Sequence, residues 1–89
     1  MRLQELVNKY IKNTEVVLAE IKIAKSIRVD SEKANNVLET AKRYWEDAKY
    51  YRDRKLFETG LATIAYSEGL LDALKLLEVA EFSWPEKEH

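Results

Sequence analysis

The stretch ANNVLETAKRYWEDAKYY, residues 34–51, repeats apolar side chains every three or four positions. At 100° per residue these positions share one stripe of a helix: Ala34, Val37, Leu38, Ala41, Tyr44, Trp45, Ala48 and Tyr51. Small alanines alternate with large aromatic residues, which lets a neighbouring helix approach closely while the rings fill the remaining space. The pattern therefore predicts a helix over residues 31–53 with one face packed against other helices.

A second amphipathic pattern precedes this stretch and predicts a helix over residues 2–27. Its apolar stripe consists of Leu3, Leu6, Val7, Tyr10, Ile11, Thr14, Val17, Leu18, Ile21 and Ala24. The pattern decays through SIRVDS, residues 26–31. There Asp30 or Ser31 can accept hydrogen bonds from the free N–H groups that begin the next helix.

A third helix is predicted over residues 56–78, after a short break near 53–56 in which Asp53 could act as the N-cap. Its apolar arc is wider than half a turn and comprises Ala62, Tyr66, Leu70, Ala73, Leu74 and Leu77, continuing to Leu71 and Ile64. An arc that wide contacts two neighbours, so the sequence predicts an all-α fold, a three-helix up-down-up bundle in a single domain. Gly69 lies on the arc, which predicts a close approach of a neighbouring helix there.

Residues 79–89 are expected to form a C-terminal tail. Pro85 ends helical propagation, and Phe82 and Trp84 are expected to fold back over the end of the bundle. His89 is either native or the remnant of a purification tag. Three further apolar residues fall outside the arc of the third helix and mark either a dimer contact or scattered surface residues: Phe57, Leu61 and Leu76.

The composition excludes several classes of protein. Of the 89 residues 35% are charged, but the net charge is only −1, so bulk charge does not select a nucleic acid or any other partner. There is no cysteine, hence no disulfide framework and no thiolate metal site. No apolar run approaches the roughly 18 residues of a membrane span. We expect a cytoplasmic protein without a membrane segment.

Catalytic signatures are missing from the sequence. The one histidine is the final residue, His89, so no base lies within the helical pattern, and serine and threonine residues occur singly on predicted helices. The two glycines, Gly60 and Gly69, form no phosphate-binding loop. We predict that the protein is not an enzyme and uses no cofactor.

Glu68 and Asp72 are four residues apart, so both carboxylates emerge on one side of the third helix and could share a divalent cation. The alternative is a polar helix edge on which Lys75 pairs with Asp72. A third interpretation is a buried carboxylate–tyrosine hydrogen bond that links the second and third helices. It would involve Asp72, Asp47 and the hydroxyl groups of Tyr44 and Tyr66.

Basic and aromatic residues interleave in AKRYWEDAKYYRDRK, residues 41–55, which is superficially typical of a nucleic-acid surface. The basic positions are Lys42, Arg43, Lys49, Arg52 and Arg54. The helical register turns most of the rings toward the core, and neighbouring acidic residues dilute the positive charge. A solvated helix face with mixed charges is the favoured interpretation.

Taken together, the second and third helices resemble an archaeal family of short all-α proteins, domain of unknown function 357. The resemblance covers residues 34–77 and rests on Ala41-x-x-Tyr44, on Asp47-Ala48 followed by Tyr50 and Tyr51, and on Tyr66-x-x-Gly69-Leu70-Leu71-Asp72-Ala73. Relatives tend to have a Gly-Asp turn where this chain has DRKLFE, residues 53–58. The first helix is similar only in being amphipathic.

This resemblance implies a three-helix bundle of spectrin-like or albumin-binding-module-like shape and an archaeal, cytoplasmic origin, but no function. Our leading hypothesis is a non-enzymatic protein–protein interaction module that binds an unknown protein partner or itself. Two alternatives stay open. One is a nucleic-acid-binding accessory protein that uses the basic positions of the second helix. The other is a divalent-metal or small-ligand site at Glu68 and Asp72.

Overall fold

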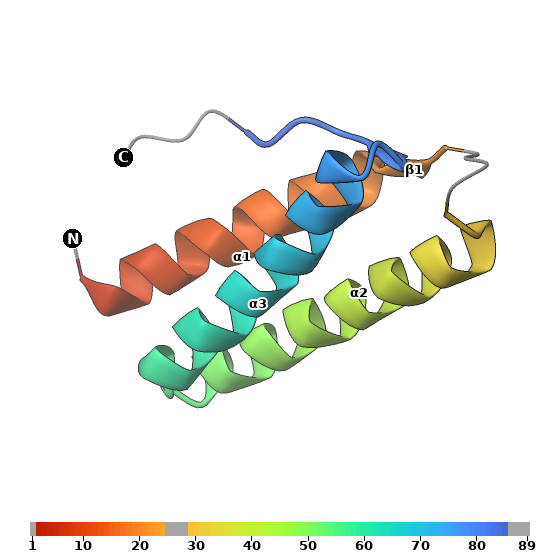
Figure 1. Ribbon diagram of the computed structural model, residues 1–89. Coiled ribbons are helices and arrows are strands. Elements are labelled where there is room, and N and C mark those ends of the chain that lie inside the picture. Colours follow the sequence, from red (N-terminus) through yellow and green to blue (C-terminus); the bar gives the residue numbers. More distant parts are fainter. Residues whose placement is uncertain (1, 25–28, 86–89) are drawn as a thin grey trace.

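Three helices form the body of the molecule (Figure 1). The structure is a computed structural model that describes residues 2–24 and 29–85. Helix α1 spans Leu3–Glu20, α2 spans Ser31–Asp53 and α3 spans Phe57–Leu76. They run up, down and up, and the whole measures 43 × 24 × 17 Å. The predicted all-α three-helix bundle is confirmed. None of the helices described is long and apolar enough to cross a membrane.

The first helix is shorter than predicted. It ends at Glu20 instead of near residue 27, and Ile21 already has extended backbone angles. Strand β1, Lys22–Ile23, follows and pairs antiparallel with β2, Ala80–Glu81. Both isoleucines, Ile21 and Ile23, pack against the core from this extended segment. β-branched residues such as isoleucine are favoured in strands. The helical spacing of the apolar residues in this segment did not by itself exclude a strand. Residues 25–27 of the predicted helix, and also His89, lie outside the described residues.

The starts of α2 and α3 differ in their capping. Asp30 is the N-cap of α2, where its Oδ1 accepts a hydrogen bond of 2.9 Å from the Glu32 N–H, as predicted. The predicted break between α2 and α3 is present at residues 54–56. Asp53 does not cap α3, because its carboxylate instead accepts a hydrogen bond from Arg52 Nε. The N-cap is Leu56, which offers no side-chain acceptor.

Helices α2 and α3 both end in a left-handed residue that is not glycine. Lys55 has φ 63° and Glu78 has φ 60°. After α2, the Leu56 N–H donates to the Tyr51 carbonyl and the Lys55 N–H to the Arg52 carbonyl. The same two bonds recur after α3, from Val79 to Leu74 and from Glu78 to Lys75. This is the Schellman pattern, which satisfies carbonyl groups that the helix end leaves open.

The core has two apolar clusters with a polar layer between them. The cluster near the strands contains Val17, Ala34, Leu38, Ala41, Leu71, Leu74, Val79, Ala80 and Phe82. The other contains Val7, Ile11, Ala48 and Ile64. Between them, Thr14 and Ser67 are fully buried. Ser67 Oγ donates to the Ala41 carbonyl at 2.8 Å, whereas Thr14 Oγ1 has no hydrogen-bond partner among the described residues.

The buried face of α3 coincides with the predicted arc only at Ile64, Leu71 and Leu74. It consists of Gly60, Ile64, Ser67, Leu71 and Leu74, while Ala62, Tyr66 and Leu77 of the predicted arc are exposed. The helix is apolar on nearly all sides, so its sequence periodicity could not choose between faces.

The close helix approach predicted at Gly69 occurs at Gly60 instead. A Cβ on Gly60 would lie 3.4 Å from Val7 Cγ1 and 3.7 Å from the Ala48 carbonyl oxygen, so Gly60 is the packing notch against α1 and α2. Gly69 is exposed, and a Cβ there would meet none of the described atoms within 4 Å. The predicted close approach at Gly69 is therefore absent from the part of the chain that the structure describes.

Candidate functional site

The second apolar side of α3 faces solvent, and we call it the outer face. Its members are Ala62, Ala65, Tyr66, Gly69, Ala73, Leu76 and Leu77. Its largest side chains are strongly exposed: Tyr66 by 56%, Leu76 by 83% and Leu77 by 58%. Positions 62, 69 and 76 are seven residues apart, so they follow one another along one line of the helix. The outer face is thus a continuous apolar strip whose middle is made of small residues.

Helix α2 borders the outer face through one aromatic pair. The rings of Tyr44 and Tyr66 stack with centroids 4.5 Å apart and an interplanar angle of 10°. Tyr44 is half-buried, and Tyr66 extends from the stack onto the surface. Two predicted signature residues are therefore brought together, as a ring stack that supports one edge of the outer face.

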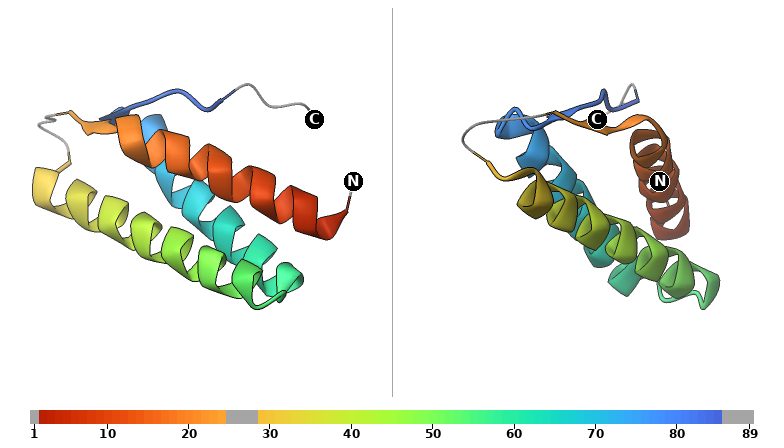
Figure 2. Two further views of the ribbon diagram at one scale, coloured as in Figure 1. Left: turned by 180° about the vertical axis from the view of Figure 1, so that it is seen from behind. Right: turned by 90° about the vertical axis from the view of Figure 1, so that its right-hand side faces the viewer.

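Asp72 lies beside the outer face and is held by the C-terminal tail. Trp84 Nε1 donates a hydrogen bond of 2.6 Å to Asp72 Oδ1, and the Trp84 ring meets the Phe82 ring edge to face at 5.4 Å. The predicted return of these two aromatic residues over the bundle is confirmed. As Figures 1 and 2 show, residues 82–85 of the tail run on the side of the molecule away from α2. Asp72 therefore links α3 to the tail.

This finding corrects the hydrogen-bond interpretation of Asp72. The expected partners were the hydroxyl groups of Tyr44 and Tyr66, which would have joined α2 to α3. The observed partner is the Trp84 indole, and Asp47 stays exposed on α2. An indole N–H is a donor only, so a carboxylate suits it. The sequence hinted at a role for Asp72 but not at its partner, which is twelve residues further along the chain.

The carboxylate pair of α3 does not assemble into a larger cluster. Glu68 is half-buried, and Asp72 is occupied by Trp84. Within residues 2–24 and 29–85, no group of three His, Cys, Asp or Glu side chains is placed to hold a metal ion. Lys75, the expected ion-pair partner of Asp72, instead lies over the Phe82 ring at 5.2 Å.

The basic residues of α2 do not share one surface. Lys42 and Lys49 are seven residues apart and lie on one side of the helix, whereas Arg43 and the C-cap residue Arg54 are turned by roughly 100° or more around the axis from Lys42. Each has a local partner: Lys42 with Glu39, Arg43 with Thr40, Lys49 with Glu46 and the Trp45 ring, Arg52 with Asp53, and Arg54 with the Tyr50 ring. Intrahelical pairing of this kind gives a mixed-charge surface.

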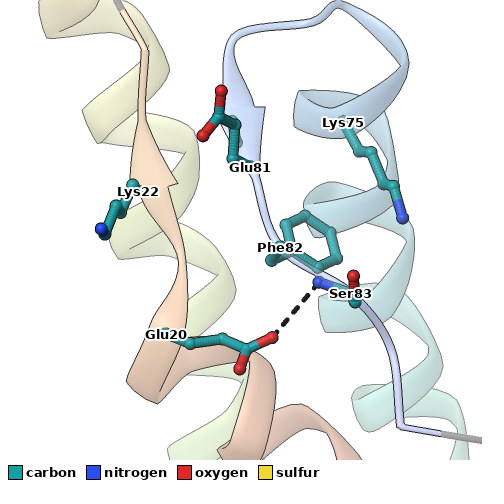
Figure 3. Close-up of a pocket in the computed structure, with 7 residues that line it drawn as sticks. Glu20, Lys22, Lys75, Glu81, Phe82 and Ser83 are labelled. Carbon is teal, nitrogen blue, oxygen red and sulfur yellow. Dashed lines mark hydrogen bonds between the residues drawn. The ribbon is translucent and has the colours of Figure 1, made fainter.

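An open pocket of about 610 Å³ lies beside the strands (Figure 3). Lys22 and Lys75 line it together with Glu20 and Glu81, so its charges balance. The Phe82 ring lies between β2 and α3, and the Ser83 N–H donates to Glu20 Oε1 at 3.2 Å, which ties the tail to α1. With balanced charges the pocket selects no ionic ligand, so the outer face is the better candidate for a binding surface.

The outer face did not emerge from the sequence, although its signal is present there. The wide apolar arc of the third helix includes Ala62, Tyr66 and Leu77, but a wide arc fits two neighbours within the chain as well as one neighbour outside it. Of the three residues predicted as a possible dimer contact, only Leu76 lies on the outer face. Phe57 and Leu61 are half-buried against the core.

Comparison with known proteins agrees with the family-like signature on α2 and α3. No match to the chain is found among curated proteins or among solved structures. The model of one family, described as protein of unknown function (DUF357), matches residues 9–80, which include most of α1, all of α2 and α3, and the start of β2. The match covers most of the chain, and the chain therefore belongs to the DUF357 family.

Proposed function

We propose that this protein is a non-enzymatic interaction module that binds a helix of another polypeptide along the outer face of α3. The observation that carries the proposal is the exposure of Tyr66, Leu76 and Leu77 on one continuous apolar strip. Contiguous apolar surface on a folded chain marks interaction sites, whereas isolated apolar residues carry no such meaning. A helix is the natural occupant because its own side chains fit between ridges spaced along α3.

The shape of the strip supports a helical partner. Four of its members, Ala62, Ala65, Gly69 and Ala73, are small and add little side-chain bulk to the surface. Small residues at a helix interface let two backbones approach closely. The stacked Tyr44 and Tyr66 rings support the strip on the side of α2. A partner helix would complete a four-helix arrangement.

Affinity capture tests this proposal with matched bait proteins. Leu76→Arg places a charge on the outer face, and Val16→Arg places the same charge at an apolar residue of α1 that is 41% exposed. Because neither side chain is buried, both variants should keep the melting temperature of the original chain. We expect Leu76→Arg to lose its captured polypeptides, this chain included, while Val16→Arg retains them. Equal capture by both variants would contradict the proposal.

A further inference from the structure

We propose that the outer face binds the outer face of a second copy, with the two α3 helices antiparallel about a two-fold axis at Gly69. This inference rests on the proposed function and names the partner of the same surface. It starts from Gly69, an interior helix residue at which an added Cβ would have none of the described atoms within 4 Å. Glycine is the least favourable helix residue except proline, and nothing within the described chain compensates for it here. Close packing of a second helix backbone over Gly69 would compensate for this cost.

The spacing of the outer face fits a copy of itself. Position 69 is central, so an antiparallel arrangement puts Gly69 of each copy together. It also puts Ala62 level with Leu76 of the second copy, and Ala65 level with Ala73. The large exposed Leu76 side chain then meets the smallest part of the opposing strip. A two-fold interface requires this self-complementarity, in which residue i meets residue j and residue j meets residue i.

Side-chain size favours the antiparallel over the parallel arrangement. A parallel pair would put Leu76 level with Leu76 and Ala62 level with Ala62, so the two strips would touch at one end and leave a gap at the other. The dipoles of two antiparallel α3 helices also attract one another, whereas parallel dipoles repel. Charge favours neither the antiparallel nor the parallel arrangement, because each end of the strip carries exposed residues of both signs. These are Lys55 and Glu58 at one end and Lys75 and Glu78 at the other.

The exposed apolar area of the outer face indicates how tightly two copies are expected to bind. Tyr66, Leu76 and Leu77 together leave on the order of 300 Å² exposed per copy, judged from usual side-chain areas and their exposed fractions. With the small residues and the rim, two copies would bury about 1,000 Å², an area typical of weak or transient interfaces. We therefore expect a weak, reversible dimer.

Single-cysteine variants test the geometry directly, because the chain has no cysteine of its own. Gly69→Cys meets none of the described atoms within its own chain and should form a disulfide-linked dimer on mild oxidation, since a residue on the two-fold axis faces its own copy at close range. Lys12→Cys, exposed on α1, is the control that should stay monomeric. A mixture of Ala65→Cys and Ala73→Cys should cross-link at least tenfold more than either variant alone. A parallel dimer would instead cross-link each variant with itself.

Sedimentation equilibrium separates this inference from the proposed function. We expect the original chain to dimerise, and Leu76→Arg but not Val16→Arg to raise the dissociation constant at least tenfold. If the chain stays monomeric at about 1 mM while Leu76→Arg still removes captured polypeptides, the second-copy inference fails and the proposed function stands. If Leu76→Arg changes neither dimerisation nor capture, both fail.

Discussion

At the scale of single residues, Gly69 weakens the helix that it belongs to. It sits inside α3, faces solvent and has open space where a Cβ would be. Gly69→Ala should therefore raise the free energy of unfolding by about 1 kcal/mol, measured by urea denaturation at a concentration where the chain is monomeric. Gly60→Ala is the matched control and should gain less, because its Cβ would lie 3.4 Å from Val7 Cγ1. Equal gains at both positions would contradict the assigned packing.

Thr14 is a second residue that lowers the free energy of unfolding through its own side chain. Its side chain is fully buried, and its hydroxyl has no hydrogen-bond partner among the described residues. Valine has nearly the same shape without the hydroxyl, so Thr14→Val should stabilise the fold by about 1 kcal/mol. Ser67→Ala, at the other side of the polar layer, should instead destabilise by a similar amount because it removes the bond to the Ala41 carbonyl. Thermal and urea unfolding of both variants check the opposite signs.

At the scale of elements, a charged hydrogen bond helps to attach the tail to α3. Trp84 Nε1 and Asp72 Oδ1 are 2.6 Å apart at a half-buried site. Trp84→Phe keeps an aromatic ring against Phe82 but removes the donor, and Asp72→Ala removes the acceptor. We expect each to cost about 1 kcal/mol and the double variant to cost less than their sum, because the bond can be lost only once. Strict additivity in the double-mutant cycle would show that the bond contributes nothing.

The elements also show where sequence reasoning succeeds and where it stops. The buried stripe of α2 was predictable because its other face is charged, so Ala34, Leu38, Ala41 and Ala48 had one possible orientation. Helix α3 has only a narrow polar edge, and its buried side includes the notch at Gly60, a tertiary contact that spacing does not encode. The end of α2 was predicted correctly at residue 53, whereas α3 ends at Leu76, two residues before the predicted end at 78. The left-handed residues that follow helices are usually glycine, but here they are Lys55 and Glu78.

The candidate site, too, could be predicted from the sequence only in part. Its strongest elements, Tyr66 and Leu77, are recognisable in the sequence as apolar residues of the third helix, but only packing shows that α1 and α2 cover the other side. The link between Asp72 and Trp84 was out of reach because it depends on how the tail folds back. In physical terms, periodicity predicts that a face is apolar. It does not predict which molecule covers that face.

At the scale of the whole molecule, the tail belongs to the core. Phe82 is only 9% exposed in the cluster that contains Val17, Leu71 and Leu74, although it lies beyond the last helix. Small domains are stable by only about 5–10 kcal/mol, so a large side chain at this position matters to the entire fold. Phe82→Ala should lower the free energy of unfolding by about 3 kcal/mol through lost burial and a residual cavity.

Urea denaturation followed by helical circular dichroism measures this loss, and the slope with denaturant should stay unchanged because the same surface unfolds. Lys22→Ala is a suitable control, since it alters an exposed residue on the strand that pairs with the tail and should change stability by less than about 0.5 kcal/mol. A Phe82→Ala variant as stable as this control would mean that the three helices hold together without the tail. The tail would then be an accessory to the bundle, and the hydrogen bond between Trp84 and Asp72 would hold only a peripheral segment in place.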